Sequence, residues 1–93
     1  MEIIHKEYGR EGVFNAVENG KQIGEMTYSW VGEDRIAIDH TGVSPAYEGQ
    51  GVGKKMVMEA VEFAREKNIK IVPICPFVDA LFTRDKNLSD VCI

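Results

Sequence analysis

The chain has 93 residues, of which 44% are hydrophobic and 28% are charged, and its formal net charge is -4. These values predict one small globular domain over residues 1–93, without a second core. The acidic balance argues against nucleic acid as a partner, and no apolar run reaches the ~18 residues that a membrane span needs. The first residues do not form a signal peptide, so we expect a cytoplasmic protein without membrane contact.

Residues 2 to about 43 consist of short segments rich in β-branched and aromatic residues, separated by turn signals. The turns fall at residues 9–12, at Asn19-Gly20 and at residues 32–34. Asn-Gly is the strongest two-residue hairpin signal because both positions tolerate a positive φ. The pattern predicts an antiparallel meander of four strands, near residues 2–8, 12–18, 21–31 and 35–43.

The apolar spacing changes to a helical period from Gly51 onward. The residues on the apolar face are Val52, Met56, Val57, Ala60, Val61 and Ala64. This helix should end near Asn68, because asparagine is tolerated in the left-handed conformation that follows a helix. The β-branched run at 69–74 predicts a buried strand. Pro76 should begin a second, shorter helix, and no clear signal follows Arg84.

A strand near 35–43, a helix and a strand near 69–74 together predict a βαβ crossover, whose two strands run parallel. The meander precedes this crossover, and both helices come from the second half of the chain. The expected fold class is therefore α+β, with an antiparallel strand meander, a βαβ crossover and a second short helix.

Residues 44–53, SPAYEGQGVG, place three glycines directly before the first helix. A helix N-terminus offers unpaired N–H groups and about half a positive charge, and glycines let a phosphate approach the backbone. The P-loop pattern fails, because Glu48 and Lys55 stand where it requires Gly and Ser or Thr, and the dinucleotide pattern fails at Met56. The segment is either a phosphate-binding loop of another kind or only a tight strand-to-helix turn.

The order Val43-x-Pro45-x-Tyr47-x-Gly49-Gln50-Gly51-Val52-Gly53 resembles the acetyl-CoA loop of the GCN5-related N-acetyltransferase (GNAT) superfamily. The pairs His40-Thr41 and Cys75-Pro76 resemble those of its short GNAT-like subfamily. The resemblance implies a compact GNAT-like fold with acetyl-CoA or coenzyme A as cofactor, its pyrophosphate held by backbone N–H groups. The implied cofactor-binding residues are Val43, Gln50, Gly51, Val52, Gly53, Lys54 and Lys55. Glu48 departs from the family's Gln or Arg, and we expect it to face solvent.

Cys75 and His40 are the candidate catalytic residues. Cys75 should lie at the end of a parallel strand and at the start of a helix, whose dipole lowers the pKa of a thiol; the alternative is a small buried apolar residue. His40 could act as a base for Cys75 or for an acceptor amine. If the strand alternates without interruption, His40 shares a face with Ile36 and Ile38, and the alternative is a histidine at the edge of the core.

Three further expectations concern the remaining histidine and cysteine. His5 should be a surface residue, Cys75 and Cys92 should be reduced thiols, and no His/Cys cluster has the spacing of metal ligands, so no metal is expected.

Three functions remain open. Many GNAT enzymes use a tyrosine on the helix after the fifth strand as general acid, whereas all tyrosines of this chain precede its first helix. The leading hypothesis is an acetyl-CoA-dependent N-acetyltransferase-like acyltransferase that uses Cys75 with His40. The second is a non-catalytic acetyl-CoA-binding or acyl-carrying module, and the third is a small interaction domain. The sequence does not identify the acceptor, whether an amine or a protein.

Overall fold

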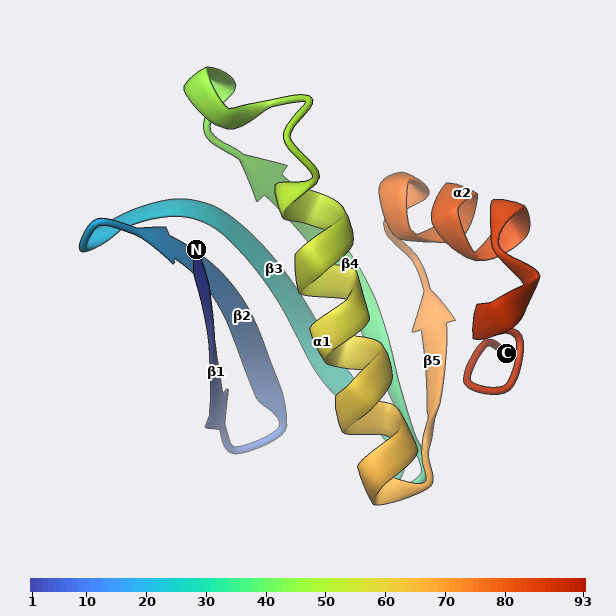
Figure 1. Ribbon diagram of the computed structural model, residues 1–93. Helices are drawn as coiled ribbons and strands as arrows, with labels where there is room; N and C mark the ends of the chain where they lie inside the picture. The colour runs from blue at the N-terminus through green and yellow to red at the C-terminus, as the bar shows by residue number, and fades with distance from the viewer.

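The computed structural model describes residues 1–93, which form a five-stranded sheet and two α-helices (Figure 1). The elements are β1 (Glu2–Tyr8), β2 (Glu11–Glu18), β3 (Lys21–Val31), β4 (Arg35–Val43), α1 (Val52–Lys67), β5 (Lys70–Pro73) and α2 (Pro76–Arg84). The strands follow one another in the order β1-β2-β3-β4-β5. The first four pair antiparallel, and β4 pairs parallel with β5, so the predicted meander, crossover and α+β class are confirmed.

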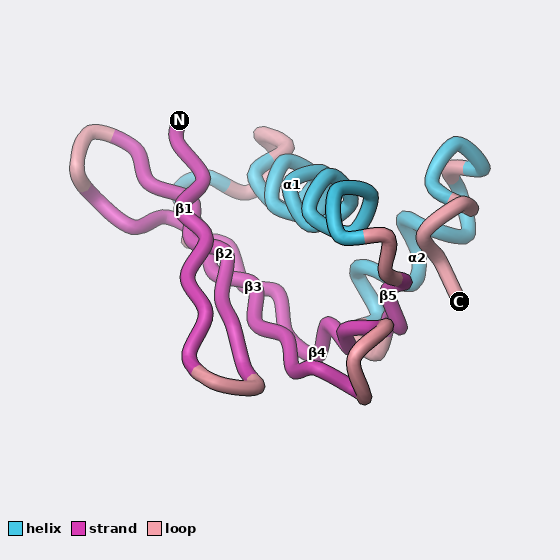
Figure 2. The backbone as a smooth tube through the Cα atoms, turned by 90° about the horizontal axis from the view of Figure 1, so that it is seen from below, coloured by secondary structure: helices cyan, strands magenta, loops and turns pink.

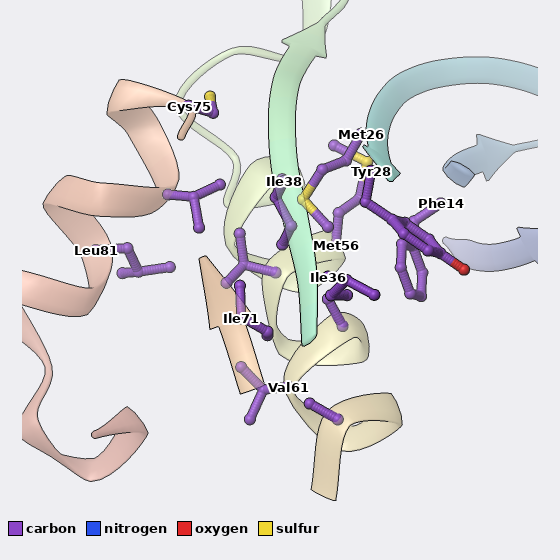
Figure 3. Close-up of a cluster of buried hydrophobic side chains, with 14 of the residues drawn as sticks. Phe14, Met26, Tyr28, Ile36, Ile38, Met56, Val61, Ile71, Cys75 and Leu81 are labelled. Carbon is purple, nitrogen blue, oxygen red and sulfur yellow. The ribbon is translucent and has the colours of Figure 1, made fainter. Parts of the chain in front are cut away.

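Helix α1 packs across one face of the sheet, and α2 lies beside β5 (Figures 1 and 2). The predicted apolar stripe of α1 is confirmed, because every residue of it is buried against the strands. In this core, Met56 and Val61 of α1 pack against side chains of the sheet (Figure 3). The sheet residues are Phe14, Met26, Tyr28, Ile36, Ile38 and Ile71. As predicted, α1 ends at Asn68, which adopts the left-handed conformation with φ 57° and ψ 47°.

Strand β4 contains a β-bulge close to its end. Ile38 pairs with Tyr28 of β3, but Thr27 pairs with His40, so Asp39 is an extra residue on β4. A bulge of this kind bends the strand and interrupts the alternation of its side chains. After the bulge, Thr41 pairs with the buried Met26 and therefore takes up the core face.

The segment after α2, for which no secondary structure was predicted, folds back onto the edge of the sheet. Leu88 and Val91 are buried there, and Ile71 of β5 forms a parallel bridge with Cys92. Arg65 of α1 binds this segment through a bidentate interaction with the Asp90 carboxylate, in which both nitrogen-to-oxygen distances are 3.0 Å. The Arg65 guanidinium also holds the pKa of the Asp90 carboxyl below its usual value.

A hydrogen-bonded group of side chains lies between β1, β3 and the C-terminal part of α1. Tyr28 Oη and Trp30 Nε1 both donate to Glu7 Oε2, each over 2.8 Å, and His5 Nε2 lies 2.6 Å from Tyr28 Oη. Because the single hydroxyl hydrogen of Tyr28 goes to Glu7, His5 donates to the hydroxyl oxygen. His5 is exposed, as expected, but its ring also stacks on Phe14 with a centroid distance of 4.1 Å.

No helix is long and apolar enough to span a membrane. Cys75 and Cys92 are both free thiols, and no group of His, Cys, Asp and Glu side chains is arranged to hold a metal ion.

Candidate active site

The glycine-rich segment forms the entry to α1. Pro45–Tyr47 make a single 3₁₀ turn after β4, and the chain then passes through Gly49 and Gly51, whose φ angles are 80° and 79°. Such positive angles favour glycine, which explains these two residues locally. No heavy atom lies within 4 Å of where a Cβ would stand at either position, so the space beside the backbone is open.

The first turn of α1 leaves its N–H groups without partners. The N-cap is Gly51, no side chain caps the helix, and no acidic residue lies in the first turn. The first intrahelical bond runs from the Lys55 N–H to the Gly51 carbonyl oxygen over 3.0 Å. The N–H groups that precede Lys55 therefore point outward together with the positive end of the helix dipole, which is an arrangement that binds anions.

A cleft of about 440 Å³ opens in front of these N–H groups. One wall is the end of β4 with the glycine-rich loop and the start of α1, and the other is α2. The lining residues are Thr41, Val43, Tyr47, Glu48, Gly49, Gly51, Val52, Gly53, Lys54, Phe77, Leu81 and Arg84. The two helices touch at the floor of the cleft, where a Cβ on Gly53 would lie only 2.8 Å from Phe77 Cζ.

Five of the seven predicted cofactor-binding residues line the cleft, namely Val43, Gly51, Val52, Gly53 and Lys54. Gln50 and Lys55 do not. The Gln50 side chain donates to the Ala46 carbonyl oxygen, and Lys55 lines a different hollow near Met1 and Met58. Glu48 is exposed, as expected, but it also lines the cleft.

Cys75 lies at the point where β4 and β5 separate. Its N–H donates to the Ile38 carbonyl oxygen over 2.9 Å, and beyond this bond the two strands no longer pair. Cys75 Sγ lies 3.4 Å from Oγ1 of Thr41, a residue that lines the cleft. The residue is only 6% exposed, and its sulfur points away from the aliphatic side chains of the core (Figure 3).

Thr41 on β4 and the start of α2 both act on the Cys75 thiol. Burial raises the pKa of this thiol, but hydrogen bonding from Thr41 and from the backbone N–H groups of Val78 and Phe77 lowers it by more. The pKa therefore lies below the ordinary cysteine value. The part contributed by the N–H groups of Val78 and Phe77 is the expected effect of a helix N-terminus on a sulfur next to it.

His40 is not brought to Cys75, and the expectation that it shares a face with Ile36 and Ile38 is wrong. The bulge at Asp39 shifts the alternation by one residue, so that His40 is exposed and pairs with Thr27 on the face away from α1. Its place on the core face is taken by Thr41. A side-chain period of two, read from the sequence, does not reveal an extra residue in a strand.

Comparison with known proteins identifies the family of the chain. A family model described as GCN5-related N-acetyl-transferase matches residues 13–91. The chain belongs to the GCN5-related N-acetyltransferase family. This match confirms the resemblance to GNAT proteins, which was inferred from the glycine-rich segment, over residues 13–91.

Solved structures agree with this GNAT assignment. A GCN5-like protein from Staphylococcus aureus is 38% identical, with a TM-score of 0.72 over 97% of this chain and 87% of that chain. A GNAT acetyltransferase from Elizabethkingia anophelis, solved with acetyl-CoA bound, is 19% identical, with a TM-score of 0.61 over 68% and 42% of the two chains. At that identity the second likeness shows the fold alone.

Among curated proteins, the match is shorter. Protein NATD1 of Homo sapiens is 30% identical over 53 residues, which are 57% of this chain and 47% of that protein. The same protein of Gallus gallus matches to the same extent, at 30% identity over 57% of this chain and 48% of that protein. The match thus spans about half the length of these relatives.

The cleft is also lined by residues that the sequence analysis did not assign to the cofactor site, namely Thr41, Phe77, Leu81 and Arg84. Thr41 was hidden by the bulge in β4. The α2 residues 77, 81 and 84 recur at the helical spacing of four and three, which places them on one face. That spacing is visible in the sequence, but it does not show which way the helix turns this face.

Proposed function

We propose that the protein binds acetyl-CoA with its pyrophosphate at the start of α1 and transfers the acetyl group to an amine. The observation that carries this proposal is the uncapped N-terminus of α1, which opens directly onto the cleft. The N–H groups of Gly51 to Lys54 supply donors, and the open Cβ positions of Gly49 and Gly51 supply room for a diphosphate. Family membership supports the same cosubstrate.

The rest of the cleft fits the other parts of such a ligand. Val43 and Phe77 line the cleft from opposite walls and offer apolar surface to an extended arm. The arm leads toward Thr41, which joins the cleft to Cys75. Lys54 adds a positive charge beside the diphosphate, and because its side chain is exposed, this attraction is worth about 1 kcal/mol or less.

Cys75 is the group that we assign to the chemical step. Its thiolate attacks the thioester carbonyl, a bond forms between Sγ and the acetyl carbon, and the bond from that carbon to the coenzyme sulfur breaks. The coenzyme leaves as a thiolate, which takes up the proton that Cys75 released. An acceptor amine then attacks the acetyl-cysteine, loses a proton and regenerates Cys75. The lowered pKa of Cys75 favours the thiolate form that this attack needs.

A second candidate function is an acetyl-CoA-binding or acyl-carrying module that does not turn over. Two observations favour it: α2 carries Phe77 and Phe82 but no tyrosine that could protonate the leaving thiolate, and Cys75 is largely buried. The two candidates share the cofactor site and differ in the fate of the acetyl group.

The cofactor site is tested by Gly51→Val, compared with Gly20→Val in the β2–β3 turn. The φ angles are 79° and 78°, and neither Cβ would meet another atom, so both variants carry the same backbone strain. Only the side chain at 51 would stand where the diphosphate must lie. We expect coenzyme A affinity to fall by about tenfold or more in Gly51→Val, because charge-assisted hydrogen bonds are lost.

The measurement is a calorimetric titration with coenzyme A, with amide shifts at Gly51 to Lys54 recorded alongside. Gly20→Val should bind like the unchanged protein once its folded fraction is known. Equal affinities of the two valine variants would remove the pyrophosphate assignment.

The environment of Cys75 is tested by the pH dependence of its alkylation with iodoacetamide. We expect the midpoint of the rate profile to lie below the ~8.5 of a free cysteine, and to move to higher pH in Thr41→Val, which removes a hydrogen bond that stabilises the thiolate. His40→Ala should leave the midpoint unchanged, because His40 lies on the other face of the sheet. A midpoint that moves in His40→Ala but not in Thr41→Val would contradict this account, because it would mean that His40, and not Thr41, sets the pKa of Cys75.

A further inference from the structure

One face of α2 presents an aromatic, an aliphatic and a basic side chain to the cleft, in that order along the helix. Phe77, Leu81 and Arg84 are spaced by four and then three residues, and all three line the cleft. Phe77 lies against Gly53 at the start of α1, and Arg84 lies seven residues further along the helix. At 1.5 Å per residue, Arg84 is about 10 Å along α2 from the point where the two helices touch.

Arg84 is a cation without a partner inside the molecule. Its guanidinium makes no ion pair and no side-chain hydrogen bond, in contrast to Arg65, which holds Asp90 and Glu62. Lys54 and Arg84 are the two basic residues of the cleft, and they lie on opposite walls. The cleft therefore has two separate positive positions, one beside the open N–H groups of α1 and one on α2.

Two separate cations match a ligand with two separate phosphate groups. Coenzyme A carries a diphosphate and, across its ribose, a 3′-phosphate monoester with a charge of about -1.5 to -2 at pH 7. The N–H groups of α1 with Lys54 suit the diphosphate. A guanidinium offers a planar pair of donors that fits a terminal phosphate better than an ammonium group does.

We infer that Arg84 recognises the 3′-phosphate of coenzyme A, with Leu81 supporting the ribose beside it. This inference rests on the proposed function, since it assigns one end of the same ligand. It makes Arg84 a specificity-determining residue, by which the protein prefers coenzyme A to 3′-dephospho-coenzyme A. A simpler role is also open to a basic residue in the last turn of a helix, namely stabilisation of the helix dipole.

The experiment is a pair of titrations, with coenzyme A and with 3′-dephospho-coenzyme A, on the unchanged protein and on Arg84→Gln. We expect the unchanged protein to bind coenzyme A about 3- to 10-fold more tightly, as for one exposed charge-assisted contact. Arg84→Gln should abolish this ratio by weakening coenzyme A alone. Arg84→Lys should restore part of it, because the charge remains and the paired donors are lost.

Lys86→Gln is the matched control, because it removes the same charge two residues further on, from a side chain that does not line the cleft. The ratio should be unchanged in this variant. Arg84→Gln that weakens both ligands equally, or that lowers only the thermal midpoint, would overturn the inference and leave Arg84 a helix-stabilising residue. If the unchanged protein bound neither ligand, the proposed function would fail as well, whereas binding of both ligands with equal affinity would overturn the inference alone.

Discussion

Incubation with acetyl-CoA is expected to add one acetyl group to the unchanged protein. The Cys75→Ala variant is expected to acquire none. The reason is that Cys75 combines a lowered thiol pKa with a position beside the cleft, through its 3.4 Å contact with Thr41. The measurement is intact mass before and after incubation. An acetyl group on sulfur is a thioester, so neutral hydroxylamine should remove it, whereas an acetylated lysine would keep its mass.

Cys92→Ala is the control for this result. Cys92 is the other free thiol and lies on the C-terminal segment beside β5, outside the cleft. This variant should acquire the acetyl group like the unchanged protein. If Cys75→Ala instead turned over an acceptor amine at the normal rate, the transfer would be direct, and Cys75 would return to the core as a small apolar residue.

The largest loss of stability is expected for Gly12→Ala on β2. A Cβ at this position would lie 2.2 Å from Cζ and 2.3 Å from Oη of Tyr28. The ring cannot move aside, because Tyr28 is 1% exposed and its hydroxyl is held by Glu7 and His5. Overpacking costs about 1–3 kcal/mol and a lost hydrogen bond about 1 kcal/mol more, which outweighs the ~0.5–1 kcal/mol that alanine gains over glycine in a strand.

The check is urea denaturation of Gly12→Ala beside Gly42→Ala on β4. At Gly42 the new Cβ would meet only the tip of the His40 ring at 3.3 Å, and this ring is free to rotate because it is exposed. Gly42→Ala should therefore stay close to the unchanged protein. A free energy of unfolding for Gly12→Ala within about 0.5 kcal/mol of the unchanged value would mean that Tyr28 is held less firmly than its contacts indicate.

Local signals in the sequence were sufficient to predict the order of the strands and both helices. Asn19-Gly20 marks a hairpin, and Asn68 and Pro76 mark where one helix ends and the next begins. These signals act within a few residues of the chain, so they do not depend on tertiary packing. The glycine-rich loop was predicted for the same reason.

The rest depended on contacts between distant parts of the chain. The bulge at Asp39 moves Thr41 to Cys75 and His40 away from it, and it arises from the pairing of β4 with β3. The residues after Arg84 have no periodicity of their own. They are ordered by Ile71 of β5, which pairs with Cys92 21 residues later, and by Arg65, which binds Asp90 25 residues later. Such long-range pairings leave no local pattern to read.

The return of the C-terminal segment to β5 also determines how the sheet can associate with other chains. Strand edges expose unpaired N–H and C=O groups, which act as templates for strands of neighbouring molecules. At β5 those groups of Ile71 are already used, because its N–H donates to Val91 and its carbonyl oxygen accepts from Ile93. The opposite edge, β1, carries the exposed charges of Glu2 and Lys6, which oppose close pairing. Fibrillar growth by strand addition is thus obstructed physically at one edge and electrostatically at the other.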